Sequence, residues 1–401
     1  MKIIHCADLH LDSKMESNFS REMSKERRNE IFRSFTRMVS YARTNDVSVI
    51  LIAGDLFDTK ADKQITIKKR CADVIRDAAN IEFLYLCGNH DEDNYFLQEG
   101  VLIPPNLKLF NKDWKSYDYG KVTISGIEFG NNNESTLYSR LNLDKNRINI
   151  VTMHGQEVAN AGKDKTEVIN LNSLKNKNID YLALGHVHLY KDKVLDGRGI
   201  YCYCGCPDGR GFDECGKKGF VVLEIDDEIV NSKEVTLKKT GASALYGDIM
   251  PAHAKGSIIL RSQEDENKAI KRSFVSFSER EFHEISVDIT QANSEQDIKR
   301  SIEAAVSAIP DADIVKIILS GEKDLRIEYD TQALLAETCS RFYFSKIYDK
   351  AELKIDYDSY RNDISLKGEF IRLIEQSNLS GDEKSHIIEA GIRALNGREL
   401  I

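Results

Sequence analysis

Residues 49–58 read VILIAGDLFD, an unbroken apolar run followed at once by a glycine and then by Asp55 and Asp58. A short apolar run that ends in turn residues is typical of a buried strand. We therefore expect a strand over residues 49–53, with both carboxylates just past its carboxyl end. In an open α/β sheet, side chains at that end of neighbouring strands converge on one crevice, so this segment indicates where a site would lie.

Four further segments repeat this plan of an apolar run that ends in polar residues. The expected strands cover residues 3–7, 83–87, 148–153 and 181–184. The motifs at their ends are Asp8-Leu9-His10, Gly88-Asn89-His90-Asp91, Met153-His154-Gly155 and Gly185-His186-Val187-His188. Nitrogen and oxygen ligands without a thiolate suit hard or borderline divalent ions such as manganese, iron or zinc. The set is typical of a two-metal hydrolytic site.

Taken in order, the five motifs resemble the calcineurin-like metallophosphoesterase superfamily, and within it the bacterial SbcD-like DNA repair exonucleases. The resemblance covers roughly residues 1–225 and is mostly architectural beyond them. It implies an α/β fold, a two-sheet sandwich flanked by helices, and two divalent ions, with Mn²⁺ expected ahead of Fe²⁺ or Zn²⁺. The ligand sets that it implies are Asp8, His10 and His188 for one metal, Asn89, His154 and His186 for the other, and Asp55 as the bridge.

The same resemblance gives His90 and Asp58 catalytic roles. His90 would face the phosphate and help the leaving oxygen depart, because an imidazole can donate a proton near pH 7. Asp58 is spaced to orient His90, and a metal-bridged water would attack phosphorus. Asp91 is expected to cap the following turn, and His5, inside the first strand, to be a hydrogen-bonded core residue.

The pattern of expected elements divides the chain into four regions. They are a nuclease domain over residues 1–240, a linker or completion of the second sheet over 241–280, an α/β capping domain over 281–360 and a helical hairpin over 361–401. The nuclease domain has expected helices over 26–44 and 65–77, and short strands over 107–130 that end in a turn at 130–133. Strand-like pieces follow at 229–237, 257–260 and 274–277, with an acidic stretch at 264–266.

The third and fourth regions are read mainly from periodicity. Expected strands cover residues 285–289, 314–319, 325–329 and 353–357, with helices near 294–309 and 332–340. This alternation resembles the small capping domain of SbcD-like nucleases, and an unrelated α/β accessory domain is the alternative. In the hairpin, Ser380 and Glu383 fit a capping box, and Gly397 fits a helix end.

The net charge of the chain indicates how strongly it could bind DNA without a partner protein. A formal net charge of −9 at pH 7 predicts weak DNA binding by this chain alone, because contacts to phosphates dominate such affinity; two divalent ions would invert the local field at the site. The resemblance implies DNA as substrate, an SbcC-type coiled-coil ATPase docked by the C-terminal hairpin, and a homodimer formed through helices of the catalytic domain. The hairpin could equally pack on its own protein. No GxxxxGK[ST] motif occurs, so any ATP would bind the partner.

Cys202, Cys204 and Cys206 invite a zinc interpretation. Alternate residues on a strand lie about 6.6 Å apart, whereas thiolates that share one zinc approach to about 4 Å. A zinc site would therefore need a bulge at Gly205. Small side chains beneath the site are the expected explanation.

These observations lead to one functional expectation and two alternatives. The motifs alone support metal-assisted phosphoester hydrolysis. The resemblance narrows this to a manganese-dependent phosphodiesterase acting on DNA, a 3′-to-5′ exonuclease with some endonuclease activity. The alternatives are a nucleotide or small-molecule phosphodiesterase and a non-catalytic scaffold for a coiled-coil ATPase. No run approaches the ~20 apolar residues of a membrane span and no signal-peptide pattern occurs, so a cytoplasmic location without membrane partners is expected.

Overall fold

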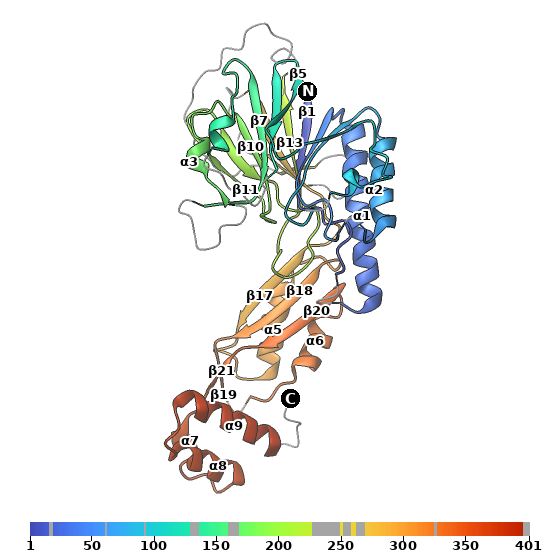
Figure 1. The fold of residues 1–401 in the computed structure, drawn as a ribbon. Coiled ribbons are helices and arrows are strands. Elements are labelled where there is room, and N and C mark those ends of the chain that lie inside the picture. The colour runs from blue at the N-terminus through green and yellow to red at the C-terminus, as the bar shows by residue number, and fades with distance from the viewer. Residues whose placement is uncertain are drawn as a thin grey trace. The chain divides into compact units, whose positions relative to one another are not determined.

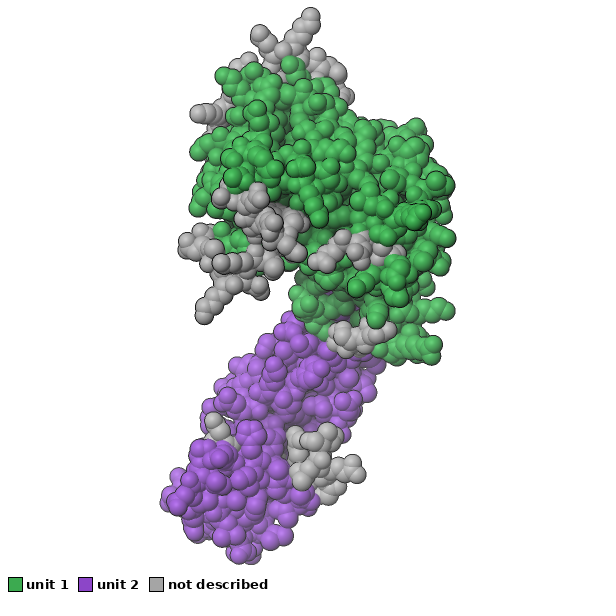
Figure 2. All heavy atoms as spheres, viewed as in Figure 1, with its two compact units in different colours: residues 1–281 green, residues 282–401 purple. Residues whose placement is uncertain are grey.

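The computed structural model describes residues 1–15, 19–60, 62–91, 94–128, 136–158, 168–226, 249–251, 258–261, 269–324 and 327–395. The chain divides into two compact units, Met1–Glu281 and Phe282–Ile401, which Figure 2 colours separately. Each unit has an apolar core of its own. The second unit holds both the predicted capping region and the predicted hairpin.

Two large sheets form the first unit, and the predicted α/β class is confirmed (Figure 1). The first sheet has the strand order β14 (Ile249–Pro251), β15 (Ile258–Arg261), β16 (Ile270–Ser276), β13 (Gly219–Ile225), β1 (Lys2–Cys6), β2 (Val49–Ala53), β3 (Glu82–Leu86) and β4 (Leu107–Leu109). The second has the order β11 (Lys191–Val194), β12 (Ile200–Tyr203), β10 (Tyr181–Gly185), β7 (Ile148–His154), β6 (Val122–Gly126) and β5 (Lys115–Tyr119). β1 to β4 run parallel, and so do β6, β7, β10 and β12.

The side chains of β2 show why its sequence is an unbroken apolar run. Val49, Leu51 and Ala53 belong to the core between the two sheets. Ile50 and Ile52 point the other way and pack in the core beneath the helices, because successive side chains of a strand face opposite sides. A strand buried on both faces has no polar positions to alternate with.

Two helices cover the outer face of the first sheet (Figure 1). α2 (Ile65–Asp77) has the predicted bounds, whereas α1 (Arg21–Thr44) begins before the predicted residue 26. The Ser20 side chain caps α1 by accepting a hydrogen bond from the Met23 amide. The first turns of α1 bury Ser24, Arg27 and Glu30, so apolar periodicity does not reveal them.

The region predicted as linker or second-sheet completion contributes to the first sheet instead. β16 pairs antiparallel with β13, which itself pairs antiparallel with β1. β13 thus lies antiparallel to both of its neighbours, and beyond β16 the sheet continues with β15 and then β14, the reverse of their order along the chain. The predicted strand over 229–237, the acidic stretch at 264–266 and the turn at 130–133 lie outside the described residues.

The second unit contains a parallel sheet of β17 (Phe282–Asp288), β18 (Ile314–Ser320) and β20 (Phe344–Asp349), with α5 (Glu295–Val306) and α6 (Thr331–Cys339). The sequence prediction missed β20, whose side chains are mostly half-buried and show no clear alternation. The strand predicted over 325–329 is wrong for its described part, because Ile327 and Tyr329 pack on the core without strand geometry. The strand predicted over 353–357 is a short one, β21 (Glu352–Lys354), paired with β19 (Glu322–Asp324).

Three helices end the described chain: α7 (Tyr357–Tyr360), α8 (Leu366–Glu375) and α9 (Gly381–Leu395). The predicted capping box at α9 forms, since Ser380 Oγ accepts from the Glu383 amide and the Glu383 carboxylate accepts from the Ser380 amide. Tyr360, Ile371 and Ile388 lie in a small core between the helices. Gly397, the predicted helix end, lies outside the described residues. Among the helices of the described ranges, none is long and apolar enough to cross a membrane.

Candidate metal centre

The five motifs meet where the carboxyl ends of parallel strands from both sheets come together. β1, β2 and β3 of the first sheet lead to Asp8 and His10, to Asp55 and to Asn89, whereas β7 and β10 of the second sheet lead to His154, His186 and His188. The predicted two-sheet sandwich thus brings strand ends from both sheets to one place. Gly185 permits their approach, because a Cβ there would lie 2.0 Å from the Ala53 carbonyl oxygen.

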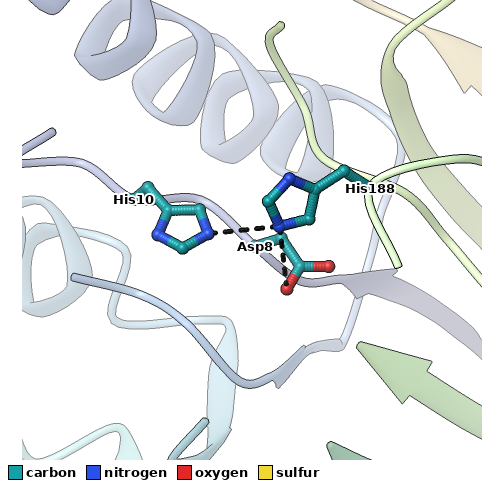
Figure 3. Close-up of side chains that lie close together, drawn as sticks. All are labelled: Asp8, His10 and His188. Atoms are coloured by element: carbon teal, nitrogen blue, oxygen red, sulfur yellow. Dashed lines mark hydrogen bonds and ion pairs between the residues drawn. The ribbon is translucent and has the colours of Figure 1, made fainter. Parts of the chain in front are cut away.

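Three predicted ligands of the first metal lie together, as Figure 3 shows. The Nε2 atoms of His10 and His188 face each other at 3.4 Å. His188 Nε2 lies 3.8 Å from an Asp8 carboxylate oxygen. Asp8 and His10 are buried, whereas the His188 side chain is 23% exposed.

The predicted ligands of the second metal also converge. Asn89 Oδ1 lies 3.0 Å from His154 Nε2 and 3.3 Å from His186 Nδ1. Asp55 Oδ2 stands between the two groups, 3.7 Å from His10 Nε2 and 3.4 Å from His154 Nε2. This is the position that a bridging carboxylate requires, and the donor set of imidazole, amide and carboxylate fits a pair of divalent ions.

Outer hydrogen bonds hold three of the imidazoles in a ligand-ready tautomer. His154 Nδ1 donates to the Ala53 carbonyl oxygen at 2.8 Å. His10 Nδ1 lies 3.1 Å from Asp58 Oδ1, and His188 Nδ1 lies 2.6 Å from Glu214 Oε1. With each Nδ1 committed to an acceptor, each Nε2 lone pair faces the centre, which is the usual arrangement around metal-binding histidines.

Four residues at the centre adopt left-handed backbone conformations, with φ of 53° at Asp8, 42° at His10, 53° at Asp55 and 96° at His186. Asp, Asn and His tolerate this region better than most residues, but it remains costly. Backbone hydrogen bonds oppose the cost: the amides of Asp8 and His10 donate to the carbonyls of Gly54 and Asp55, both at 3.0 Å. The His186 amide donates to the Asp8 carboxylate at 2.9 Å.

His90 and Asp58 lie beside the ligands, in contact with each other. His90 Nδ1 is 2.9 Å from Asp58 Oδ1, and the His90 side chain is 44% exposed. Burial opposes the charge on Asp58, but hydrogen bonds from His10 and His90 outweigh burial and hold its pKa below the usual range. The hydrogen bond to Asp58 raises the pKa of His90. Asp58 thus orients two imidazoles, one of which the sequence had not assigned to it.

In the part of the chain that the structure describes, neither Asp91 nor His5 belongs to the groups of side chains that could hold a metal ion. The cap of the following turn that was predicted for Asp91 involves residues 92 and 93, which lie outside the described residues. The Asp91 carboxylate accepts hydrogen bonds from the amides of Leu56, Phe57 and Gly88, so it secures the loop that carries Asp55. Burial and then the charge of Asp55 raise the pKa of Asp91 to about 7. His5 is fully buried and forms a 2.8 Å hydrogen bond with the Tyr181 hydroxyl.

The loop after β12 supplies two residues that sequence reasoning missed. Glu214 supports His188, and the Arg210 guanidinium donates to Glu214 from Nε and Nη2, both at 3.2 Å. Arg210 Nη1 lies 3.6 Å from Asp58 Oδ1. The available signal was an Arg and a Glu in the Gly-rich segment GRGFDE over residues 209–214, about twenty residues after the last motif.

A buried ionic network fixes this loop to α1. Arg27 is fully buried, and its Nη2 donates to Asp208 Oδ1 and to the Gly209 carbonyl, each at 2.7 Å. Ser34 donates to the other Asp208 oxygen at 2.8 Å. Arg27 also pairs with Glu30, and Glu30 lies 3.0 Å from Arg280.

The cysteine cluster does not gather its three thiols. Cys202, Cys204 and Cys206 are buried. Among the described residues, no group of candidate ligand side chains contains two of them, although Cys206 lies near His188 and Glu214. Gly205 turns the backbone with φ of 71°. The expectation of small side chains packed beneath the site accounts for them.

Comparison with known proteins agrees with this geometry. Residues 1–190 match the calcineurin-like phosphoesterases. The chain is similar to the DNA double-strand break repair protein Mre11 of Saccharolobus solfataricus (28% identical, covering 59% of this chain and 64% of the relative). It is also similar to the SbcD component of the nuclease SbcCD of Escherichia coli K12 (25% identical, 56% and 64%) and to the uncharacterized metallophosphoesterase YhaO of Bacillus subtilis (27%, 56% and 57%).

The matched regions span less than two thirds of the length of each of these relatives. Residues 1–190 belong to the calcineurin-like phosphoesterase family, whose members use a dinuclear metal site. Mre11 and SbcD proteins are homologues of the chain, in agreement with the SbcD-like branch that the motifs indicated. The clustered Asp and His side chains described above are able to hold metal.

Proposed function

We propose that this chain is a metal-dependent phosphodiesterase that hydrolyses DNA, acting as a 3′-to-5′ exonuclease with endonuclease activity in repair. The observation that carries the proposal is the pair of ligand groups that share Asp55, with His90 beside them and partly exposed. The named relatives include DNA repair proteins and a component of a nuclease, which supports DNA as the polymer.

The residues divide the work as follows. Asp8, His10 and His188 would hold one ion, Asn89, His154 and His186 the other, and Asp55 both. When bound, two divalent ions supply positive charge to the phosphoryl oxygens and make water nucleophilic at neutral pH. His90, kept protonated more readily by Asp58, donates a proton to the leaving oxygen. We propose Mn²⁺ as the metal, with Fe²⁺ and Zn²⁺ as the alternatives.

We propose an SbcC-type coiled-coil ATPase as the partner, bound through α8 and α9. Leu366 and Leu373 on α8 are 68% and 62% exposed, and Ile387 and Leu395 on α9 are 37% and 44% exposed. Apolar side chains left uncovered on two adjacent helices suit a helical partner. The homodimer and the cytoplasmic location stay predictions.

Digestion of 3′- and 5′-end-labelled duplex DNA with added Mn²⁺ tests the function. We expect mononucleotides released from 3′ ends. His90→Ala should keep the metal content, measured by elemental analysis, and lower turnover by about 10²–10⁴-fold. Asp55→Asn should lose metal.

His283→Ala is the matched control, because His283 in the second unit also pairs with a carboxylate, Asp313, at 2.9 Å. Full activity in His90→Ala would remove its catalytic role. Intact DNA together with cleavage of a chromogenic phosphodiester would favour a smaller substrate. Absence of both activities in a metal-loaded protein would favour the scaffold alternative.

A further inference from the structure

Arg210 is a cation at the centre that no ligand role explains. Its backbone amide donates to Glu214 Oε2 at 2.8 Å, and its Nε and Nη2 donate to Glu214 Oε1 at 3.2 Å. One face of the guanidinium fork is therefore fixed by the same carboxylate that supports His188. The side chain is 20% exposed, so it reaches solvent without being free to move.

The remaining guanidinium nitrogen, Nη1, is not bonded to Glu214. Nη1 has no hydrogen-bond acceptor among the described residues, and its 3.6 Å distance from Asp58 Oδ1 is too long for a hydrogen bond. The same Asp58 oxygen accepts from His90 at 2.9 Å. Arg210 Nη1 and His90 Nδ1 thus lie beside the same Asp58 oxygen, which His10 Nδ1 also contacts at 3.1 Å.

The surroundings hold Arg210 in this orientation. Gly209, the preceding residue, accepts from the buried Arg27, and Asp208 binds both Arg27 and Ser34 on α1. The ionic network of α1 therefore fixes the loop that carries Arg210. A charged group that is fixed before the ligand arrives loses little freedom on binding.

We propose that Arg210 binds a phosphoryl oxygen of the substrate through Nη1, beside the metal centre and next to His90. A guanidinium stays charged throughout the pH range of catalysis and matches phosphate geometry. The inference rests on the proposed function, because that function makes the substrate a phosphodiester.

Equilibrium binding of inorganic phosphate to the full-length, Mn²⁺-loaded protein tests this, measured by calorimetry with metal content determined on the same sample. Arg210→Gln should weaken phosphate binding about tenfold or more, the size expected for a lost charge-assisted hydrogen bond, and should leave metal content unchanged. The phosphate affinity of Arg210→Lys should lie between those of the wild type and Arg210→Gln. Lysine keeps the positive charge but cannot contact Glu214 and the phosphate at the same time.

The matched control is Arg198→Gln. Arg198 binds Asp180 through Nε and Nη2 at 2.9 Å and is also 20% exposed, but it lies at the other end of β12, away from the centre. Its phosphate affinity should equal that of the wild type. Where Arg210→Gln does not fold, Arg210→Lys decides the question.

Three results would overturn the inference: unchanged phosphate affinity in the Arg210 variants, loss of metal in parallel with phosphate, or no phosphate binding by the metal-loaded wild type. The second result would assign Arg210 to the support of Glu214 and His188. A different result would contradict the proposed function: the wild type would bind phosphate through Arg210 but cleave no phosphodiester.

Discussion

At the scale of single residues, the carboxylates that accept hydrogen bonds from the histidines are as important to the site as the ligands themselves. Asp58 serves His10 and His90 with one oxygen, and Glu214 serves His188 and Arg210. Hydrogen bonds from His188 and the charge of Arg210 outweigh burial and lower the pKa of Glu214 to about 2. A carboxylate held in its charged form strengthens the imidazole that it orients.

Glu214→Gln should therefore lower metal affinity about 10–100-fold, the usual effect of changing a residue that orients a ligand. The amide oxygen can still accept from His188, so the loss reports the charge. Titration with Mn²⁺ measures it. Glu82→Gln is the control, because Glu82 pairs with Lys108 at the amino end of β3, and equal affinities in both variants would refute the role of Glu214.

At the scale of elements, α1 acts as a support for the loop after β12. Its first turns bury charged rather than apolar side chains, and these connect Asp208 of the loop with Glu30 and, through Glu30, with Arg280. Such a network requires the desolvation of several charges, so it contributes more to position than to net stability. It places Arg210 and Glu214 opposite the ligand-bearing strand ends.

Arg27→Met should cost about 3–5 kcal/mol of unfolding free energy, because it leaves Asp208 buried without its cationic partner. Urea denaturation of the two proteins measures the difference. Arg76→Met on α2 removes a surface arginine that is 42% exposed and pairs with Asp73 at 2.6 Å, and it should cost less than about 1 kcal/mol. Similar small losses in both variants would contradict the supporting role.

Helices and strands could be predicted from the sequence where their burial produces a regular pattern of apolar residues. Strands such as β2, buried on both faces, appear as unbroken apolar runs, and the Ser380 capping box marks α9. β20 is half-buried and was missed. Glu214 and Arg210 were missed as well, because a loop residue acquires its role from tertiary contacts that no local spacing records.

At the scale of the whole first unit, the centre joins two sheets. The expected ligands come from both, and the sequence could not assign β7 and β10 to a second sheet because their apolar runs resemble those of β1 to β3. A pair of ions bound there would cross-link the edges. Metal binding should therefore stabilise the whole first unit against unfolding.

A chelator should lower the unfolding transition of the first unit and leave that of the second unchanged, as followed by calorimetry. With free metal at 100 times Kd, the expected loss is about 2.7 kcal/mol for a single site. Asp55→Asn, which should bind no metal, serves as the control and should not respond to the chelator. A shift of both transitions, or of neither, would contradict this view.

The left-handed backbone at Asp8, His10, Asp55 and His186 has a further consequence. Glycine would occupy such positions with less strain. An engineer who sought a more heat-resistant chain would be drawn to these four places, as strained sites commonly offer stabilising substitutions. Each gain in heat resistance would remove a candidate ligand, so at these positions robustness and chemistry are opposing aims.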